Sequence, residues 1–204
     1  MLGYYNYTVI LTYISLCVSV VGIHFAMSGK PVFAFICLMT SGFCDMLDGP
    51  IARTKARNDE EKEFGIQIDS LTDLVCFGVF PAVIAYSLGM KNSFSVLILL
   101  LYVLCAMIRL AYFNVQESSR QKQTTDKRKY YSGMPVTTSA IIFPLVFAFK
   151  DYLGTYFIQI YGAIVIIVAM LFVLDIRIRK ASKKGLGVMV IIALIEFILL
   201  MRLI

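Results

Sequence analysis

The chain has 204 residues, of which 59% are hydrophobic and only 16% are charged, and its mean hydropathy is +0.81. An average soluble domain carries about 25% charged residues, so this composition excludes an ordinary soluble domain and indicates a polytopic membrane protein. The net charge of +6 is expected in cytoplasmic loops, near anionic lipid head groups. Nucleic-acid binding is not expected, because the basic residues lie between apolar stretches and form no soluble basic face.

Seven apolar stretches are candidates for membrane-spanning helices, which need roughly 20 mostly apolar residues each. They lie at residues 7–27, 32–47, 65–88, 94–115, 134–149, 156–174 and 186–200. We therefore predict an all-α helix bundle that forms a single membrane domain over residues 1–204, with an additional apolar segment at 186–204. No basic region precedes the first stretch, so we expect a retained span and not a cleaved signal peptide.

The basic residues predict the orientation of the bundle, because loops rich in Lys and Arg face the cytoplasm. Three alternate loops, those after the second, fourth and sixth stretches, hold most of this charge: Arg53, Lys55, Arg57, Lys62; Arg120, Lys122, Lys127, Arg128, Lys129; and Arg177, Arg179, Lys180, Lys183, Lys184. The other loops hold only Lys30, Lys91 and Lys150. We expect the N-terminus and the three basic loops on the cytoplasmic side of the cell membrane, and the C-terminus outside if the last stretch spans the bilayer.

Four aspartates lie in or beside the second and third apolar stretches, in the segments DMLDGPIAR (45–53) and GIQIDSLTD (65–73). Residues three or four apart share one face of a helix. Two stripes result: Asp45, Asp48, Gly49 and Ala52 on one helix, and Gly65, Asp69 and Asp73 on the next. The small residues of these stripes allow a close approach of backbones or of a ligand. Two helices joined by a short polar loop are therefore expected to face each other through their acidic sides.

A charged aspartate at the centre of a membrane helix costs about 2.5–3.5 kcal/mol, and converging carboxylates also repel one another. Protons or cations must offset this charge, and a set of oxygen ligands suits Mg²⁺, Mn²⁺ or Ca²⁺. The alternative is a row of capping or solvated residues at helix ends. A zinc site is not expected, because the chain has one histidine, His24, and five cysteines without a CxxC pair.

A carboxylate cluster that holds metal at the membrane surface permits two classes of function: transport of metal ions or protons, and phosphoryl chemistry on a lipid-linked substrate. Arg53 favours the second class, because it follows the first stripe by one residue and can clamp a phosphate oxygen. The alternative for Arg53 is ordinary positive charge on the cytoplasmic side. A purely structural membrane protein leaves all four aspartates unexplained.

The pattern D45-x-x-D48-G49-x-x-A52-R53, followed by G65-x-x-x-D69-x-x-x-D73, resembles the signature of the CDP-alcohol phosphatidyltransferase family. Three further segments resemble its branch of integral-membrane phosphatidylserine synthases: DSLTDLVCFGVFPA (69–82), RLAYFNV (109–115) and YYSGMPVTTSA (130–140). One departure is the polar loop 54–64, whose eleven residues exceed the family spacing of about eight or nine, a change that loops accept cheaply. The resemblance implies a six-helix core at about 7–174, to which the last apolar segment is an addition.

The resemblance also implies a reaction and the roles of the motif residues. The hydroxyl of L-serine would attack the lipid-side phosphorus of CDP-diacylglycerol or CDP-archaeol, and CMP would leave. The implied metal ligands, for Mg²⁺ or Mn²⁺ with Ca²⁺ as an alternative, are Asp45, Asp48, Asp69 and Asp73. Asp73 is also the implied general base. The implied contacts of the CDP-lipid are Asp45, Asp48, Gly49, Ala52, Arg53 and Gly65. The resemblance further implies a homodimer among membrane lipids.

The acceptor alcohol is expected to be serine, whose carboxylate and ammonium need a cation and an acceptor in the pocket. Arg109 and Asn114 are the candidates, because an arginine in an otherwise apolar helix is a functional hypothesis. The alternative for Arg109 is a side chain that extends to the membrane interface. Two other interpretations stay open: the same chemistry with glycerol phosphate or inositol phosphate as acceptor, and a divalent-cation transporter, which does not explain the spacing of Gly49, Ala52 and Arg53.

Overall fold

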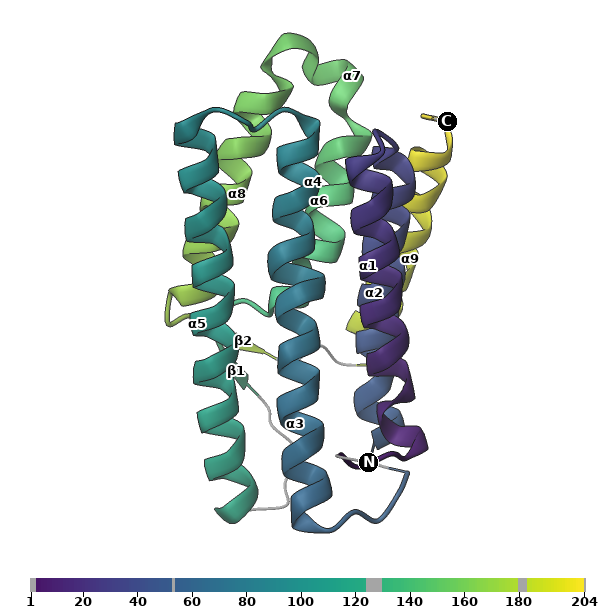
Figure 1. Cartoon of the computed structure of the whole chain (residues 1–204), viewed down its shortest axis with the longest axis vertical. Helices are drawn as coiled ribbons and strands as arrows, with labels where there is room; N and C mark the ends of the chain where they lie inside the picture. The colour runs from purple at the N-terminus through teal and green to yellow at the C-terminus, as the bar shows by residue number, and fades with distance from the viewer. Residues whose placement is uncertain (1–2, 53, 124–129, 180–182, 204) are drawn as a thin grey trace.

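The computed structural model of the chain describes residues 3–52, 54–123, 130–179 and 183–203. Long helices run side by side along one axis, and the N-terminus lies at the end of the bundle opposite α7 (Figure 1). The helices are α1 (Ile10–Met27), α2 (Pro31–Ala52), α3 (Asp59–Asp73), α4 (Phe80–Leu88), α5 (Ser93–Gln123), α6 (Ser139–Ala148), α7 (Lys150–Leu153), α8 (Phe157–Val173) and α9 (Lys183–Met201). Short 3-10 turns lie at Tyr7–Val9, Val136–Thr138 and Gly154–Tyr156, and a π-helical segment, Leu74–Val79, joins α3 to α4.

Within the described residues, five helical stretches are long and apolar enough to cross a membrane, which confirms the predicted polytopic helical bundle. They are Tyr7–Met27, Pro31–Ala52, Asp59–Leu88, Ser93–Ser119 and Lys150–Val173. The expected fifth and seventh spans are shorter apolar helices, Val136–Ala148 and Gly187–Met201. The last of these packs against α2 and α6. The chain is therefore an integral membrane protein.

Every described residue of the acidic motif lies on a helix. The hydropathy pattern predicted that the first of these two helices ends too early and that the second begins too late. α2 continues past the expected end at Leu47 to Ala52, with Pro50 in its last turn. The next helix begins at Asp59 and not at Gly65, because Asn58 caps it: the Asn58 side chain accepts from the Glu61 N–H at 2.7 Å, and Glu61 accepts from the Asn58 N–H at 3.1 Å. Polar residues thus extend both helices beyond their apolar runs.

Close packing between α1 and α2 holds α2 in place. The Ser19 and Ser41 hydroxyls lie 2.8 Å apart, and Ser41 donates to the Ser15 carbonyl at 3.1 Å. A Cβ at Gly22 would lie only 2.7 Å from Cβ of Cys37 on α2 and 2.2 Å from the Phe80 ring on α4, so α1 approaches both helices closely only because residue 22 has no side chain. Small residues and polar contacts of this kind join helices in lipid, where burial of apolar surface gives little driving force.

The π-helical segment begins directly after Asp73, and the Phe80 N–H donates to the Val75 carbonyl, five residues earlier. Pro81 has no N–H for the Phe77 carbonyl, its regular α-helical partner. The Tyr102 hydroxyl donates to this carbonyl instead, at 2.6 Å, and the Ser139 hydroxyl approaches it at 3.5 Å. Side chains of α5 and α6 therefore satisfy a backbone group that the irregular helix leaves open.

A small antiparallel ribbon, which the sequence did not predict, pairs β1 (Tyr130–Ser132) with β2 (Arg177–Arg179) about halfway along the bundle (Figure 1). The Gly133 N–H donates to the Ile176 carbonyl at 2.8 Å, and the Met134 N–H to the Leu171 carbonyl at 3.1 Å. Gly133 has φ +76°, and a Cβ there would lie 2.9 Å from the Phe172 carbonyl oxygen, so glycine is required. The segment before α6 is thereby fixed to the end of α8.

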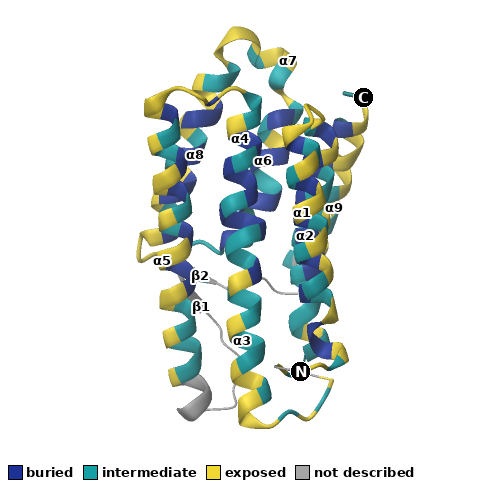
Figure 2. Cartoon of the chain, in the orientation of Figure 1, coloured by how far each residue is buried: buried dark blue, intermediate teal, exposed yellow. Residues whose placement is uncertain are grey.

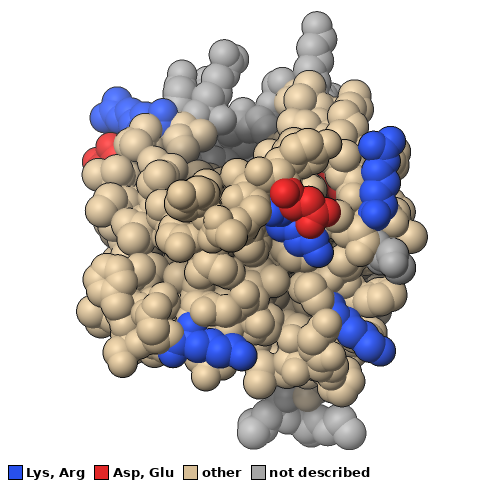
Figure 3. Space-filling view, turned by 90° about the horizontal axis from the view of Figure 1, so that it is seen from above, with Lys and Arg blue, Asp and Glu red and all other residues tan. Residues whose placement is uncertain are grey.

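The two ends of the bundle differ in character. Buried side chains concentrate along α4 and α6, whereas α3 carries mostly intermediate and exposed residues (Figure 2). The buried part is rich in aromatic residues: Phe35, Phe77, Phe80, Tyr102, Phe143, Phe147, Tyr161 and Phe172. The end that carries α7 shows a few separate basic side chains on a mainly uncharged surface (Figure 3). The basic α2–α3 loop, which follows the first acidic stripe, lies at the opposite end of the bundle (Figure 1).

We predict that Tyr102→Phe lowers the melting temperature in detergent, because it leaves the buried Phe77 carbonyl without its short hydrogen bond. The expected loss is about 1–3 kcal/mol in the free energy of unfolding. Tyr152→Phe is the matched control, since Tyr152 is 89% exposed and its hydroxyl can bond to solvent or head groups. Thermal unfolding followed by circular dichroism measures both variants, and an unchanged melting temperature for Tyr102→Phe would refute the assigned role.

Candidate metal centre and active site

Three of the four aspartates meet between α2 and α3. One carboxylate oxygen from each of Asp45, Asp48 and Asp69 lies within 4.8 Å of the others. All three side chains are partly buried, so the cluster is sheltered by the bundle without being sealed in it. The two acidic stripes expected from the sequence therefore turn toward one shared place, and this geometry does not fit a row of separate solvated residues.

Asp73 lies one helical turn beyond Asp69 and faces the same place. Its carboxyl interacts with that of Asp45 through a side-chain hydrogen bond, and the carboxyls of Asp48 and Asp69 interact in the same way. α2 and α3 run in opposite directions (Figure 1), so Asp45 lies opposite Asp73 and Asp48 lies opposite Asp69. By the same antiparallel spacing, the next facing pair toward the N-terminal end of the bundle would be Ala52 and Gly65.

The donor set fits a hard divalent cation. All of its ligand atoms are carboxylate oxygens, which suit Mg²⁺, Mn²⁺ or Ca²⁺ and not the softer metals that prefer Cys or His. Carboxylates this close repel one another strongly when charged, and a bound cation offsets that repulsion. Among the described residues, no Lys or Arg forms an ion pair with these four aspartates; the ion pairs there join Lys55 to Glu61 and Lys62 to Asp59.

The glycines of the motif occupy different surroundings. A Cβ at Gly49 would meet nothing within 4 Å, so open space lies beside the cluster at that position. A Cβ at Gly65 would lie 2.9 Å from Nη1 of Arg57, which the sequence reasoning did not single out. Ala52 ends α2 and is partly buried. Arg53 lies outside the described residues.

Arg109 and Asn114, the residues predicted to bind serine, make different contacts. Arg109 is buried, its Nε donates to the Met134 carbonyl at 3.2 Å, and its guanidinium lies over the Phe113 ring at 5.5 Å. The side chain is therefore packed inside the bundle. The Asn114 carbonyl oxygen accepts from the Ser70 hydroxyl at 2.6 Å, next to Asp69. Five positions on a helix correspond to a rotation of about 140°, which explains the different directions of the two side chains.

Comparison with known proteins adds the family. A family model described as CDP-alcohol phosphatidyltransferase matches residues 5–174. The chain is 39% identical over 135 residues to the CDP-diacylglycerol–serine O-phosphatidyltransferase of Saccharomyces cerevisiae, which covers 63% of this chain and 47% of the yeast protein. It is 32% identical over 145 residues to the protein of the same name from Mycobacterium tuberculosis (71% and 49%). It is 30% identical over 154 residues to the archaetidylserine synthase of Methanothermobacter thermautotrophicus (74% and 60%). The chain thus spans about half the length of the first two relatives.

We predict that Asp48→Asn weakens Mn²⁺ binding by at least about tenfold, because one charged ligand oxygen of the cluster is lost. Electron paramagnetic resonance of free Mn²⁺ in a titration of the detergent-solubilised protein measures the affinity. Asp59→Asn is the control, since Asp59 lies on the same helix but is exposed and paired with Lys62. Equal Mn²⁺ affinities of wild type and Asp48→Asn would show that the cluster is not a metal site.

Proposed function

Because this chain belongs to the CDP-alcohol phosphatidyltransferase family, we propose that it transfers the phosphatidyl group of CDP-diacylglycerol, or the archaetidyl group of CDP-archaeol, to L-serine. The serine oxygen forms a bond to the lipid-side phosphorus, the bond from that phosphorus to the CMP oxygen breaks, and the hydroxyl proton passes to a carboxylate. The convergence of the motif aspartates of α2 and α3 carries this proposal. The choice of serine is supported by the names of the relatives.

Asp45, Asp48 and Asp69 would hold Mg²⁺ or Mn²⁺, with Ca²⁺ as an alternative, and Asp73 would share this role. A metal ion held by these residues would supply positive charge that stabilises the diphosphate and the departing CMP. Gly49 leaves open space beside Asp48, where the diphosphate can approach the backbone closely. Ala52 and Gly65 lie at the end of the site nearer the basic α2–α3 loop, and together with Arg53 they would contact the nucleotide.

Asp73 is the proposed general base. Its position supports this assignment: it faces Asp45, but it is not one of the three residues whose oxygens meet within 4.8 Å. A serine hydroxyl is a weak nucleophile, so a positioned carboxylate must accept its proton as the bond to phosphorus forms. The four aspartates would therefore divide between holding the donor and activating the acceptor.

Serine recognition is proposed for Arg109 and Asn114. A buried guanidinium in a membrane helix is suited to bind a carboxylate, and the bond from Ser70 places Asn114 beside the turn that carries Asp69. The active site would lie on the cytoplasmic side of the cell membrane, because the N-terminal end of the bundle carries the basic α2–α3 loop. A homodimer is part of the same proposal and rests on family resemblance.

The proposal is tested by incubation of the purified protein with a CDP-lipid, labelled serine and Mn²⁺ or Mg²⁺. We expect equal amounts of CMP and of a labelled serine lipid, and no product after addition of EDTA. Production of CMP only with glycerol phosphate or inositol phosphate would replace serine as the acceptor. Metal flux in sealed vesicles without CMP release under any condition would point to transport and would reject the transferase.

We predict that Asp73→Asn lowers the rate of serine transfer by about 10²–10⁴-fold, the usual contribution of a general base. The amide keeps the size of the carboxyl but cannot accept the proton. Binding of labelled CMP in the presence of Mn²⁺ should stay within twofold of wild type, because the cluster of Asp45, Asp48 and Asp69 is intact in this variant. Turnover at the wild-type rate would exclude Asp73 as the base.

We predict that Gly49→Ala raises the KM for the CDP-lipid by about tenfold without a loss of thermal stability. The new methyl group meets no protein atom within 4 Å, but it occupies the space proposed for the diphosphate. Gly42→Ala, on the same helix, is the contrasting control, because its Cβ would lie 2.7 Å from Cβ of Ala140. That variant should lose stability. Unchanged kinetics for Gly49→Ala would place the donor elsewhere.

We predict that Arg109→Ala raises the KM for serine by about tenfold, while the KM for the CDP-lipid changes less than twofold. A purely structural role, through the bond to the Met134 carbonyl, would instead lower the melting temperature and affect both substrates alike. Steady-state kinetics with each substrate varied in turn separates these outcomes. An unchanged serine KM would remove Arg109 from the serine site.

A further inference from the structure

Among the described residues of the loop between α2 and α3, Arg57 has a positive charge that no acidic side chain neutralises. Lys55 pairs with Glu61 at 3.1 Å, and Lys62 pairs with Asp59 at 2.9 Å. Among the residues that the structure describes, Arg57 has no carboxylate oxygen within the 4.0 Å limit of an ion pair. The loop therefore presents a guanidinium whose charge is available to a ligand.

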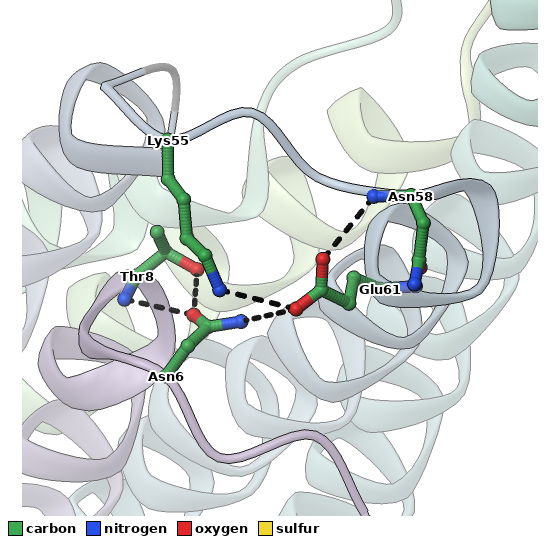
Figure 4. A network of polar contacts seen from close by, with 5 residues as sticks. All are labelled: Asn6, Thr8, Lys55, Asn58 and Glu61. Atoms are coloured by element: carbon green, nitrogen blue, oxygen red, sulfur yellow. Dashed lines mark hydrogen bonds and ion pairs between the residues drawn. The ribbon is translucent and has the colours of Figure 1, made fainter.

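The loop around Arg57 is held firmly by the N-terminal segment and by α3 (Figure 4). Glu61 accepts from Lys55, from the Asn6 side chain at 3.3 Å and from the Asn58 N–H. Asn6 in turn accepts from the Thr8 N–H at 3.0 Å. Residues on both sides of Arg57 thus take part in one connected network, which fixes the point from which its side chain extends.

The Arg57 side chain lies on the acidic stripe of α3. Its Nη1 is 2.9 Å from the position that a Cβ on Gly65 would occupy, so the guanidinium fills the place of the missing side chain. Gly65 precedes Asp69 by one helical turn, and residues so spaced have Cβ atoms about 5–6 Å apart. The guanidinium therefore lies close to the proposed metal centre, on the side of the loop.

This placement indicates which part of the donor the guanidinium meets. The lipid tails must stay among the apolar spans, whereas CMP is polar and must leave toward water, and the α2–α3 loop is the polar segment beside Gly65. A guanidinium matches the geometry of phosphate oxygens and can donate two parallel hydrogen bonds to them. On the basis of the proposed function, we propose that Arg57 binds the phosphate that departs with CMP.

Direct binding of labelled CMP and labelled cytidine to the full-length protein, in the presence of Mn²⁺, tests this role without requiring turnover. We expect Arg57→Ala to weaken CMP binding by about tenfold or more and to leave cytidine binding within twofold of wild type. Arg57→Lys should restore part of the CMP affinity. Lys62→Ala is the matched control, because it removes one positive charge near the start of α3, at a residue already paired with Asp59.

Unchanged CMP affinity in Arg57→Ala would overturn the assignment, as would an equal loss for CMP and cytidine, which indicates a contact with the nucleoside or a distorted site. Absence of CMP binding to the wild type would also reject it. Thermal unfolding of Arg57→Ala and Lys62→Ala should agree within about a degree, since neither side chain belongs to the buried core. If the wild type binds CMP but transfers no phosphatidyl group to serine, the proposal that serine is the acceptor is rejected. The CMP affinity of Arg57→Ala still tests the role of Arg57 in that case.

Discussion

The structure depends on the approach of four carboxyl groups from two antiparallel membrane helices. Asp45 and Asp48 on α2 meet Asp69 and Asp73 on α3, with three of the oxygens inside a space of 4.8 Å. Such crowding is costly in a medium of low dielectric constant unless cations or protons offset it. A bundle that brings these groups together must be stiff enough to oppose their repulsion, and much of the surrounding packing supplies that stiffness.

Two features hold the helices that carry the carboxyls. On one side, α1 fixes α2 through Ser15, Ser19 and Ser41 and through the absence of a side chain at Gly22. On the other side, the π-helical segment that follows Asp73 is fixed by the hydroxyl of Tyr102. π-Helical turns within α-helices are frequent at functional sites, and here the irregularity sits directly after the residue proposed to be the base. The aspartates are therefore presented by helices that are held from both sides.

One part of the bundle contains the buried aromatic core, and another contains the polar residues of the proposed site. The aromatic core is built from residues of α2, α4, α5, α6 and α8, while α3 and the loop before it are less buried and more polar (Figure 2). A polar site near one end suits a reaction between a substrate anchored in lipid and a substrate dissolved in water. The capped start of α3 and the network around Glu61 show how this end stays ordered without an apolar core.

The sequence alone determined the membrane class, the approximate spans and the acidic stripes, because hydropathy and a repeat of three or four residues are local properties of a helix. It also singled out the aspartates, since charge in apolar helices is costly. The predicted helix ends were wrong where polar residues extend or cap a helix beyond its apolar stretch, as at Ala52 and Asp59. The β1–β2 ribbon, the Tyr102–Phe77 bond, the separate surroundings of Arg109 and Asn114, and the placement of Arg57 over Gly65 were decided only by the tertiary structure. Each of them joins residues distant in the chain or depends on how a loop folds back, and no periodicity within one segment specifies such contacts.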